Sequence, residues 1–334
     1  MKGLILAAGR GTRLRPLTHT RPKPVIRVAG RPIIHYAVEN LREAGVAEIG
    51  VVVSPETEKD IREALSGYPV RYILQEEPQG LAHAVAVAGD FLKESPFVLY
   101  LGDNLFQRGI RPYLEAFREG VSAVLALVRV ENPRQFGVAV LEGERIVRLL
   151  EKPKDPPSDL AVAGVYVFTP EVLEVIQDLK PSARGEYEIT DAIQGLIDRG
   201  RRVVGVEVEG WWKDTGRPED LLDANRLLLE ELAPKVEGEV EESALTGRVV
   251  VEKGARVVRS TVIGPAFIGE GAVVEGAYVG PFTSLGPGAR VVRSEVEYSI
   301  LEDHAVVENV GLRLQESLLG VGARVQSRNG LPRA

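Results

Sequence analysis

Cysteine is absent from this chain of 334 residues, so disulfide bonds, thiolate metal sites and a cysteine nucleophile are excluded. Long apolar runs are absent as well. No stretch approaches the ~20 apolar residues that a membrane helix needs, and the apolar part of MKGLILAAG is too short for a signal peptide. We therefore expect a cytoplasmic protein with no membrane segment.

Acidic side chains are missing from one region of an otherwise acidic protein. The net charge of −7 argues against general nucleic-acid binding, yet residues 1–38 contain eight Lys and Arg and no Asp or Glu. A basic segment placed in this way predicts a binding site for a compact anion. A solvated basic surface is the alternative interpretation.

The length predicts two domains, and the pattern of the chain changes once. Up to residue 232, short runs of Val, Ile and Leu alternate with helical periods. This alternation favours an α/β domain with a Rossmann-like, mostly parallel sheet covered on both faces. The predicted strands are 2–8, 48–54, 70–75, 97–103, 123–130, 162–168 and 203–209, and the predicted helices are 33–44, 56–66, 80–93, 110–119, 170–178, 188–199 and 218–232. Residues 136–153 are expected to form a hairpin or meander inserted into this pattern.

A polar segment, residues 233–243, is interpreted as a linker to a second domain at 244–334. There aliphatic residues recur every five or six positions, often before small or acidic residues, which is typical of a solenoid of short strands. The region resembles the hexapeptide-repeat left-handed parallel β-helix, and an antiparallel domain rich in Val and Gly is the alternative. The recurring residues are Val251, Val257, Ile263, Ile268, Val274, Val279, Leu285, Val291, Val296, Leu301 and Val307.

The first strand runs into a glycine turn, LILAAGRGTRLRPLTHTRPKP, which offers backbone N–H groups to an anion. A dinucleotide-binding turn is excluded by the missing third glycine, and no G-K-[ST] of a phosphate loop is present. The pattern suits a triphosphate. Backbone amides of residues 8–12 would bind the outer phosphates, and the Arg13 guanidinium could contact two phosphate oxygens at once. Lys23 would place its point charge at the phosphorus under attack. The other arginines of this segment, Arg15, Arg21, Arg27 and Arg31, are interpreted as surface salt-bridge partners.

These residues resemble the L-A-[GA]-G-x-G-T-R-L…P-K signature of sugar-1-phosphate nucleotidyltransferases. Further motifs of the family follow in order: QEEPQGLAHAV, YLGDN, FGV, EKP, VAGVY, RGEYEITD and WWKDTGRPEDLLDAN. The resemblance is nearest to long-form glucose-1-phosphate thymidylyltransferases, which carry a C-terminal β-helix. Ala8 and Pro24 depart from the double glycine and P-K-Q common in enzymes that use dTTP. The resemblance is therefore firmer on the reaction than on the base.

The reaction that the resemblance implies is attack of a sugar-1-phosphate oxygen on the α-phosphorus of a nucleoside triphosphate, with release of pyrophosphate. Catalysis would depend on cations and on the positioning of the two substrates, without a protein nucleophile. Asp103, which ends the apolar run FVLYLGD, and Asp214 resemble the family's pair of Mg²⁺ ligands. The alternative interpretations are a turn aspartate at Asp103 and a capping residue at Asp214.

The resemblance also implies binding residues. Those for the sugar phosphate are Gly137, Glu151, Lys152, Val162 and Arg184, and those for the nucleotide are Leu6, Ala8, Gly9, Gly11, Thr12, Arg13, Gln75 and Gly80. The alternatives are a charged turn at EKP and a surface glutamine at Gln75. Glu188 and Asp191 are candidates for sugar hydroxyls, or mark a helix start with Thr190 as its cap.

Three expectations concern the rest of the chain. At least one of Trp211 and Trp212 is expected in the core, and the histidines of the first domain are expected to make packing or polar contacts. The β-helix is expected to support a homo-oligomer. The competing functions are a uridylyltransferase with acyltransfer in the β-helix, where His304 is the only histidine, and a catalytically silent subunit.

Overall fold

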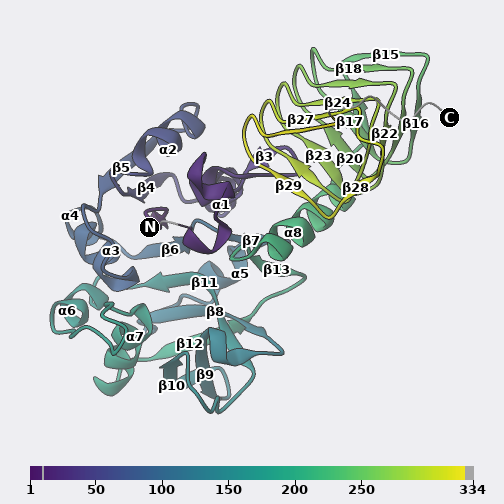
Figure 1. The fold of residues 1–334 in the computed structure, drawn as a ribbon. Helices are drawn as coiled ribbons and strands as arrows, with labels where there is room; N and C mark the ends of the chain where they lie inside the picture. Colours follow the sequence, from purple (N-terminus) through teal and green to yellow (C-terminus); the bar gives the residue numbers. More distant parts are fainter. Residues whose placement is uncertain (10, 328–334) are drawn as a thin grey trace. The chain divides into compact units, whose positions relative to one another are not determined.

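The computed structural model describes residues 1–9 and 11–327 (Figure 1). The chain divides into two compact units that are interleaved in sequence. The first unit comprises residues 1–10 and 34–214, and the second comprises residues 11–33 and 215–334. Residues 11–33, which are called the basic segment from here on, therefore belong to the same unit as the C-terminal region. The sequence pattern did not indicate this.

The first unit is built on a nine-stranded sheet with the order β5-β4-β1-β6-β11-β8-β12-β10-β9. The strands are β1 (Lys2–Leu6), β4 (Glu48–Val53), β5 (Val70–Leu74), β6 (Phe97–Leu101), β8 (Ala123–Arg129), β9 (Gly137–Glu142), β10 (Arg145–Glu151), β11 (Leu160–Phe168) and β12 (Val203–Glu207). All seven predicted strands are confirmed, and the expected hairpin is β9–β10. Every residue of β11 is buried, as expected of a central strand covered on both faces.

The sheet is mixed rather than uniformly parallel. The order β5-β4-β1-β6 is parallel throughout, as is the pair β12–β8. Strand β11 runs antiparallel to both of its main neighbours, β6 and β8. The apolar runs of β6, β8 and β11 are alike, because burial on both faces determines their composition whatever their direction.

Helices connect these strands where the apolar periods predicted them. They are α1 (Ile33–Glu43), α2 (Glu58–Ala64), α3 (Leu81–Val87), α4 (Gly89–Leu92), α5 (Arg111–Glu115), α6 (Val172–Gln177) and α7 (Ile189–Asp198). The helix expected over 80–93 is divided at Ala88, where the backbone leaves helical geometry before Gly89. Glycine lowers the helix propensity at that point.

The second unit contains a three-sided parallel β-helix, in agreement with the left-handed β-helix expected for this region (Figure 1). One face holds β14 (Lys235–Val236), β17 (Val249–Val251), β20 (Ala266–Ile268), β23 (Thr283–Leu285), β26 (Ile300–Leu301) and β29 (Leu318–Leu319). The next holds β15 (Glu239–Glu241), β18 (Arg256–Val258), β21 (Val273–Glu275), β24 (Arg290–Val292), β27 (Val306–Glu308) and β30 (Arg324–Gln326). The third holds β16 (Ala244–Thr246), β19 (Thr261–Ile263), β22 (Tyr278–Val279), β25 (Glu295–Glu297) and β28 (Leu314–Gln315).

One aliphatic residue of each central strand points into the β-helix and is fully buried, which confirms the short repeat. The repeat was misplaced at one position: Val262 is buried, whereas Ile263 is partly exposed. Adjacent residues of a strand point to opposite sides, so a one-residue shift exchanges inside for outside.

Residues 233–243, expected as a linker, instead begin the β-helix. Strand β14 pairs with β17, and β15 pairs with β18. Val240 packs against the β-helix core, while its neighbours Glu239 and Glu241 face water. The segment appeared structureless because an end coil of a solenoid exposes most of its side chains.

Three further parts of the second unit precede the β-helix in sequence. The helix α8 (Pro218–Glu231) confirms the last predicted helix, and the short strands β2 (Arg27–Val28) and β3 (Arg31–Pro32) form a hairpin. Single turns of 3₁₀ helix at Thr12–Leu14, Leu17–His19 and Lys23–Val25 make up most of the remaining basic segment.

Candidate active site

A cavity of about 130 Å³ opens in the first unit. It is lined by Leu81, Leu101, Asn104, Gln135, Phe136, Gly137, Glu151, Lys152, Val162, Gly164, Tyr166, Glu188, Ile189, Thr190, Trp212 and Asp214. The wall brings together motifs that are far apart in the sequence, including FGV, EKP and VAGVY. Of the five residues expected at the sugar phosphate, Gly137, Glu151, Lys152 and Val162 line the cavity, whereas Arg184 does not.

Two aspartates come together beside this cavity through a short antiparallel pair. Strand β7 (Asn104–Phe106) pairs with β13 (Trp212–Asp214), and Asn104 lies opposite Asp214. Asp103 therefore lies one residue from the position that faces Asp214, and both aspartates are half-buried. The Asn104 amide donates a hydrogen bond to Asp103 Oδ1 at 2.8 Å and accepts one from Trp212 Nε1 at 2.8 Å. Asn104 thus links both strands.

Gly164 provides the space that Asn104 occupies. Its φ is +76°, and a Cβ at this position would lie 2.7 Å from Asn104 Oδ1. Only glycine satisfies both conditions. The glycine of VAGVY, which the sequence analysis quoted without a role, therefore allows the asparagine between the two aspartates to approach β11.

The carboxylates of Asp103 and Asp214 suit Mg²⁺ better than they suit a metal ion whose ligands all come from the protein. In the described part of the chain, no group of three or more His, Cys, Asp or Glu is arranged to hold an ion. Two carboxylates suffice for Mg²⁺, which keeps several waters and takes phosphate oxygens as further ligands. The adjacent positions of Asp103 and Asp214 provide that pair.

Glu151, which also lines the cavity, is the centre of a charged cluster. Its Oε1 lies 3.1 Å from the Arg184 guanidinium and 3.4 Å from Lys152 Nζ. Its Oε2 accepts a hydrogen bond from Thr190 Oγ1 at 3.1 Å. The carboxylate is therefore held from two sides, and two cations stand beside it. An anion with hydroxyl groups, such as a sugar phosphate, matches this combination of charges.

Gly137 brings backbone close to this cluster. A Cβ there would lie 2.7 Å from Thr190 Cγ2 and 3.5 Å from Glu151 Oε2. The adjoining turn is also unusual, because Lys152 adopts a φ of +40° while its amide donates to the Phe136 carbonyl. These contacts join FGV and EKP into one surface.

Glu188 lies at the floor of the cavity and is 5% exposed. Burial raises the pKa of its carboxyl, even though Ser182 donates a hydrogen bond to it. Helix α7 begins at Ile189, immediately after this residue, so a helix start is confirmed here. Thr190 is not its cap, because its hydroxyl donates to Glu151 instead.

Gln75 is buried, so its interpretation as a surface glutamine is wrong. It follows β5, is 2% exposed, and its Nε2 lies 2.8 Å from His83 Nδ1. An amide nitrogen can only donate, so Nδ1 accepts and His83 carries its proton on Nε2. This contact confirms the polar role expected for that histidine. It fixes the orientation of the Gln75 amide.

Gly80 has a steric reason to be glycine. Its φ is +110°, and a Cβ would lie 2.5 Å from the Tyr187 carbonyl oxygen. We expect Gly80→Ala to lower the free energy of unfolding by about 1–3 kcal/mol more than Gly45→Ala does, because overpacking adds to backbone strain. Gly45 has a φ of +85° and open space around its Cβ position, so it is the matched control. Chemical denaturation of both variants measures the difference, and equal losses would contradict this steric account.

The glycine turn itself is divided between the two units. Leu6, Ala8 and Gly9 belong to the first unit, and a Cβ at Gly9 would meet nothing within 4 Å. Ala8 is part of the core beneath the turn, and the Leu6 carbonyl accepts from the Gly102 amide. Arg10, whose amide belongs to the same turn, lies outside the described residues.

The remaining signature residues, Gly11, Thr12, Arg13 and Lys23, belong to the second unit. Gly11 has a φ of +59°, and a Cβ there would lie 3.1 Å from Lys23 Cβ and from Thr18 Cγ2. The Thr18 hydroxyl donates to the Gly11 carbonyl at 2.9 Å. Lys23 is 8% exposed, whereas Arg13 is exposed. The segment thus folds back so that its glycine turn and its lysine are neighbours.

Several residues at the cavity were missed or misjudged from the sequence. Trp212 lines the cavity and packs edge-to-face on Phe136, with ring centroids 5.9 Å apart. Neither it nor Trp211 is in the core, so that expectation was wrong. Asn104 and Tyr166 were also missed; Asn104 could have been suggested by its place after Asp103 in YLGDN. His304 lies exposed in a turn of the β-helix.

Comparison with known proteins places the chain in a family. Residues 2–231 match the model of the nucleotidyl transferase family, and the protein belongs to that family. It is 44% identical to a glucose-1-phosphate thymidylyltransferase of Streptomyces antibioticus over 343 residues, covering 100% of this chain and 96% of the relative. A low-salt glycan biosynthesis nucleotidyltransferase of Haloferax volcanii is 46% identical over 98% of this chain and 94% of the relative.

Solved structures agree with these relatives. A Bacillus anthracis structure given as a glucose-1-phosphate thymidylyltransferase in complex with a sucrose has a TM-score of 0.65 at 37% identity, covering 70% of this chain and 98% of that one. A UDP-glucose pyrophosphorylase with UDP-glucose has a TM-score of 0.63 at 27% identity, covering 69% and 99%. Within residues 1–9 and 11–327, none of the helices combines the length and apolar character needed to cross a membrane.

Proposed function

We propose that this protein is a glucose-1-phosphate thymidylyltransferase, which transfers the thymidylyl group of dTTP to glucose-1-phosphate. The products are dTDP-glucose and pyrophosphate. The observation that carries the proposal is the pairing of β7 with β13, which brings Asp103 within one residue of the position facing Asp214, next to a cavity lined by Glu151 and Lys152. Arg184 forms an ion pair with the same Glu151. Full-length similarity to thymidylyltransferases supports the choice of nucleotide and sugar.

In the proposed reaction, an oxygen of the sugar phosphate forms a bond to the α-phosphorus of dTTP. The bond from that phosphorus to the bridging oxygen breaks, and pyrophosphate leaves with the electron pair. Both reactants are anions, so the protein must offset their repulsion and hold them in line. We assign that work to Lys23 at the α-phosphate, and to Arg13 and the amides of residues 8–12 at the outer phosphates.

Asp103 and Asp214 are the proposed ligands of Mg²⁺. A bound Mg²⁺ ion supplies positive charge that stabilises the phosphate oxygens of the nucleotide. The hydrogen bond from Asn104 holds the Asp103 carboxylate in place, and Trp212 in turn orients Asn104. The Asp103 carboxylate is therefore positioned before substrate arrives.

The sugar phosphate is assigned to the cavity of the first unit. Lys152 and Arg184 attract its phosphate, Glu151 accepts hydrogen bonds from its hydroxyls, and Gly137 and Val162 form the adjoining wall. Among the nucleotide contacts, Gln75 is assigned to the base, because an amide both donates and accepts on a pyrimidine edge. Leu6 and Gly80 are proposed to contact the base through their backbone.

Product analysis with dTTP, UTP, GTP and ATP, each paired with several sugar-1-phosphates, tests the proposal. We expect pyrophosphate release and a nucleotide sugar to appear fastest with dTTP and glucose-1-phosphate, and only when Mg²⁺ is present. Faster reaction with UTP would favour a uridylyltransferase. No product with any pair would favour a catalytically silent subunit and would overturn the proposal.

Replacing Glu151 with alanine is expected to raise the KM for glucose-1-phosphate by about 10-fold or more, because a hydrogen bond to a charged group contributes ~1.5–3 kcal/mol. The KM for dTTP should change little. Steady-state kinetics with each substrate varied in turn measures both constants. Glu207→Ala is the control, since Glu207 pairs with Arg129 on the exposed surface. An equal rise in both KM values would contradict the assignment of Glu151 to the sugar.

A homo-oligomer, supported by the β-helix, and a cytoplasmic location complete the proposal. The ends and flat faces of a solenoid suit self-association. Sedimentation of the full chain tests the first point, and a monomer mass at micromolar concentration would contradict it.

A further inference from the structure

One turn of the β-helix departs from the sequence of its neighbours. The turn that closes the β14–β29 face reads Glu-Lys-Gly-Ala at 252–255, Gly-Glu-Gly-Ala at 269–272, Gly-Pro-Gly-Ala at 286–289 and Gly-Val-Gly-Ala at 320–323. At 302–305 it reads Glu-Asp-His-Ala, which alone among these five turns has two acidic residues in succession. The backbone is similar, because His304 has a φ of 60° where the equivalent glycines have 65–75°. In the coils directly before and after, the residue equivalent to Glu302 is a glycine. The β-helix itself therefore does not need an acidic side chain there.

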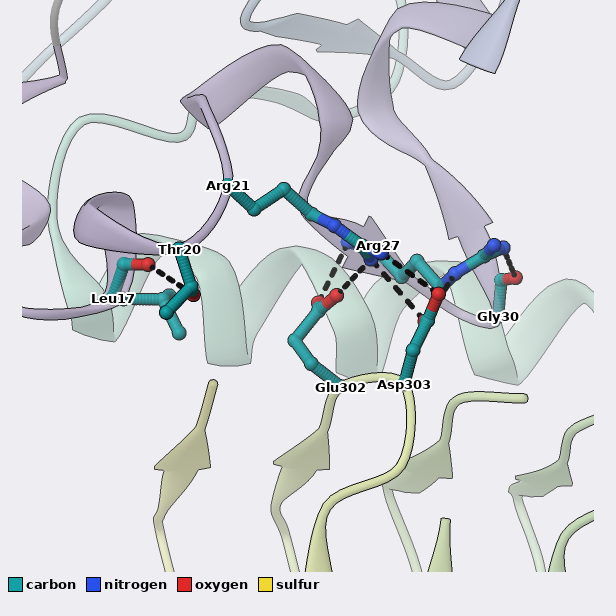
Figure 2. Close-up of polar contacts among 7 residues, drawn as sticks. All are labelled: Leu17, Thr20, Arg21, Arg27, Gly30, Glu302 and Asp303. Atoms are coloured by element: carbon teal, nitrogen blue, oxygen red, sulfur yellow. Dashed lines mark hydrogen bonds and ion pairs between the residues drawn. The ribbon is translucent and has the colours of Figure 1, made fainter. Parts of the chain in front are cut away.

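Glu302 and Asp303 instead bind two arginines of the basic segment (Figure 2). Arg21 donates to Glu302 Oε2 at 2.5 Å and to Asp303 Oδ2 at 2.7 Å. Arg27 donates from its side chain to Asp303 Oδ1 at 2.8 Å and from its backbone amide to Glu302 Oε1 at 2.8 Å. Ion pairs were predicted correctly for these arginines, but their expected place on the surface was wrong. The side chains of Arg21 and Glu302 are only 16% and 2% exposed.

The cluster is largely removed from water, and this changes the pKa values of its carboxyl groups. Burial raises the pKa of Glu302 to about 7, against the lowering effect of Arg21. For Asp303, burial raises the pKa, but the hydrogen bond from Arg21 and the charge of Arg27 outweigh it and leave the pKa below its usual value. Buried ion pairs add little net stability, yet breaking one leaves an uncompensated charge. The cluster therefore favours a single geometry of the basic segment.

A second buried contact holds the same segment. Asn225 of α8 is fully buried, and its Oδ1 accepts from the Ala29 amide and from the Ser284 hydroxyl, both at 2.8 Å. Its Nδ2 donates to the Phe282 carbonyl at 3.0 Å. In the same β2–β3 hairpin, a Cβ on Gly30 would lie 2.2 Å from the Phe267 ring. The hairpin is thus fitted closely against the β-helix.

Lys23 lies between Arg21 and Arg27 in sequence, within the anchored segment. We propose that Glu302 and Asp303 are positioning residues that hold this segment so that Lys23 is placed for catalysis. The β-helix then anchors the segment that carries Lys23, in addition to being a candidate assembly surface. The inference rests on the proposed function for the role of Lys23. The anchoring of residues 11–33 by itself does not depend on that role.

The test compares Asp303→Ala with Glu275→Ala in the full-length protein. Glu275 pairs with Arg259 at 2.7 Å on an exposed part of the same β-helix, outside the turn that binds Arg21 and Arg27. We expect Asp303→Ala to lower kcat by about 10-fold or more, because small displacements of a catalytic group are costly. The KM for glucose-1-phosphate should stay within about twofold, and Glu275→Ala should match the unaltered protein.

A double variant separates positioning from a general loss of structure. If Asp303 acts through Lys23, then Lys23→Ala/Asp303→Ala is no slower than Lys23→Ala alone. Multiplication of the two losses would overturn the inference. Asp303→Asn, which keeps the side-chain shape, should retain an intermediate rate.

Hydrogen exchange provides a measurement that does not require activity. In Asp303→Ala, amides of residues 11–33 should exchange faster than in the unaltered protein, while those of β6 and β11 should not. If the unaltered protein shows no turnover, the proposed function fails, and this measurement alone decides the anchoring. If the protein is active, but Asp303→Ala matches Glu275→Ala in both rate and exchange, the inference fails and the function stands.

Discussion

Asp103→Ala is expected to lower kcat by about 100-fold or more, the usual scale for losing one contact that stabilises charge in the transition state. Asp103 and Asp214 are the two proposed Mg²⁺ ligands, and Asp103 lies one residue from the position that faces Asp214, so its loss halves the carboxylate charge that the protein offers to Mg²⁺. A higher Mg²⁺ concentration should restore part of the rate, because the weakened site still contains Asp214. Initial rates over a Mg²⁺ titration measure both effects.

The matched control for this variant is Asp178→Ala. Asp178 is 75% exposed and forms a surface ion pair with Arg199, so its loss should leave kcat unchanged. A loss below about threefold in Asp103→Ala would contradict the assignment of Asp103. A similar loss in Asp178→Ala would show that the assay reports stability.

Lys23→Ala is the second variant for which a large effect is expected, again a loss of about 100-fold or more in kcat. A point charge close to the phosphorus offsets the repulsion between two anionic reactants, and no neutral side chain replaces it. Lys23→Arg should recover only part of the rate, because the guanidinium is larger and this side chain is buried. Unlike the Asp103 variant, Lys23→Ala should not be rescued by additional Mg²⁺.

Lys180→Ala is the control for the loss of a positive charge, since Lys180 is exposed. Full activity in Lys23→Ala would remove the central electrostatic argument for this site. Thermal unfolding of each variant should be recorded alongside, because Lys23 lies in a segment that is closely packed in the second unit.

Much of the fold could be predicted from local patterns. The strands of the sheet were located to within about two residues, because buried strands need short runs of β-branched and aliphatic side chains. The coils of the β-helix were recognised because one buried aliphatic residue per strand repeats along the solenoid. Residues of the sugar cavity came from motifs whose spacing within each strand or turn is local, such as EKP and VAGVY.

Pairings between distant segments were not visible in the same way. Nothing in RPKPVIR shows that its arginines bind a turn some 280 residues later. The two successive acidic residues at 302–303, where the coils before and after have glycine at the first position, were a usable signal. Likewise, Thr190 was considered as a helix cap because a hydroxyl near a helix start usually acts so. A carboxylate from another strand, Glu151, competes for that hydroxyl in the folded chain.

The sequence by itself determined the elements, the repeat, the family of the protein and the residue types available for phosphate and metal chemistry. Each of these depends on side chains that are close together along the chain. Tertiary structure alone decided three outcomes. The pairing of β7 with β13 brings Asp103 near Asp214. The supposed linker begins the β-helix, and residues 11–33 belong to the same unit as the C-terminal region. Those outcomes depend on strand register and buried ion pairs, whose energies arise only when distant residues are brought out of water together.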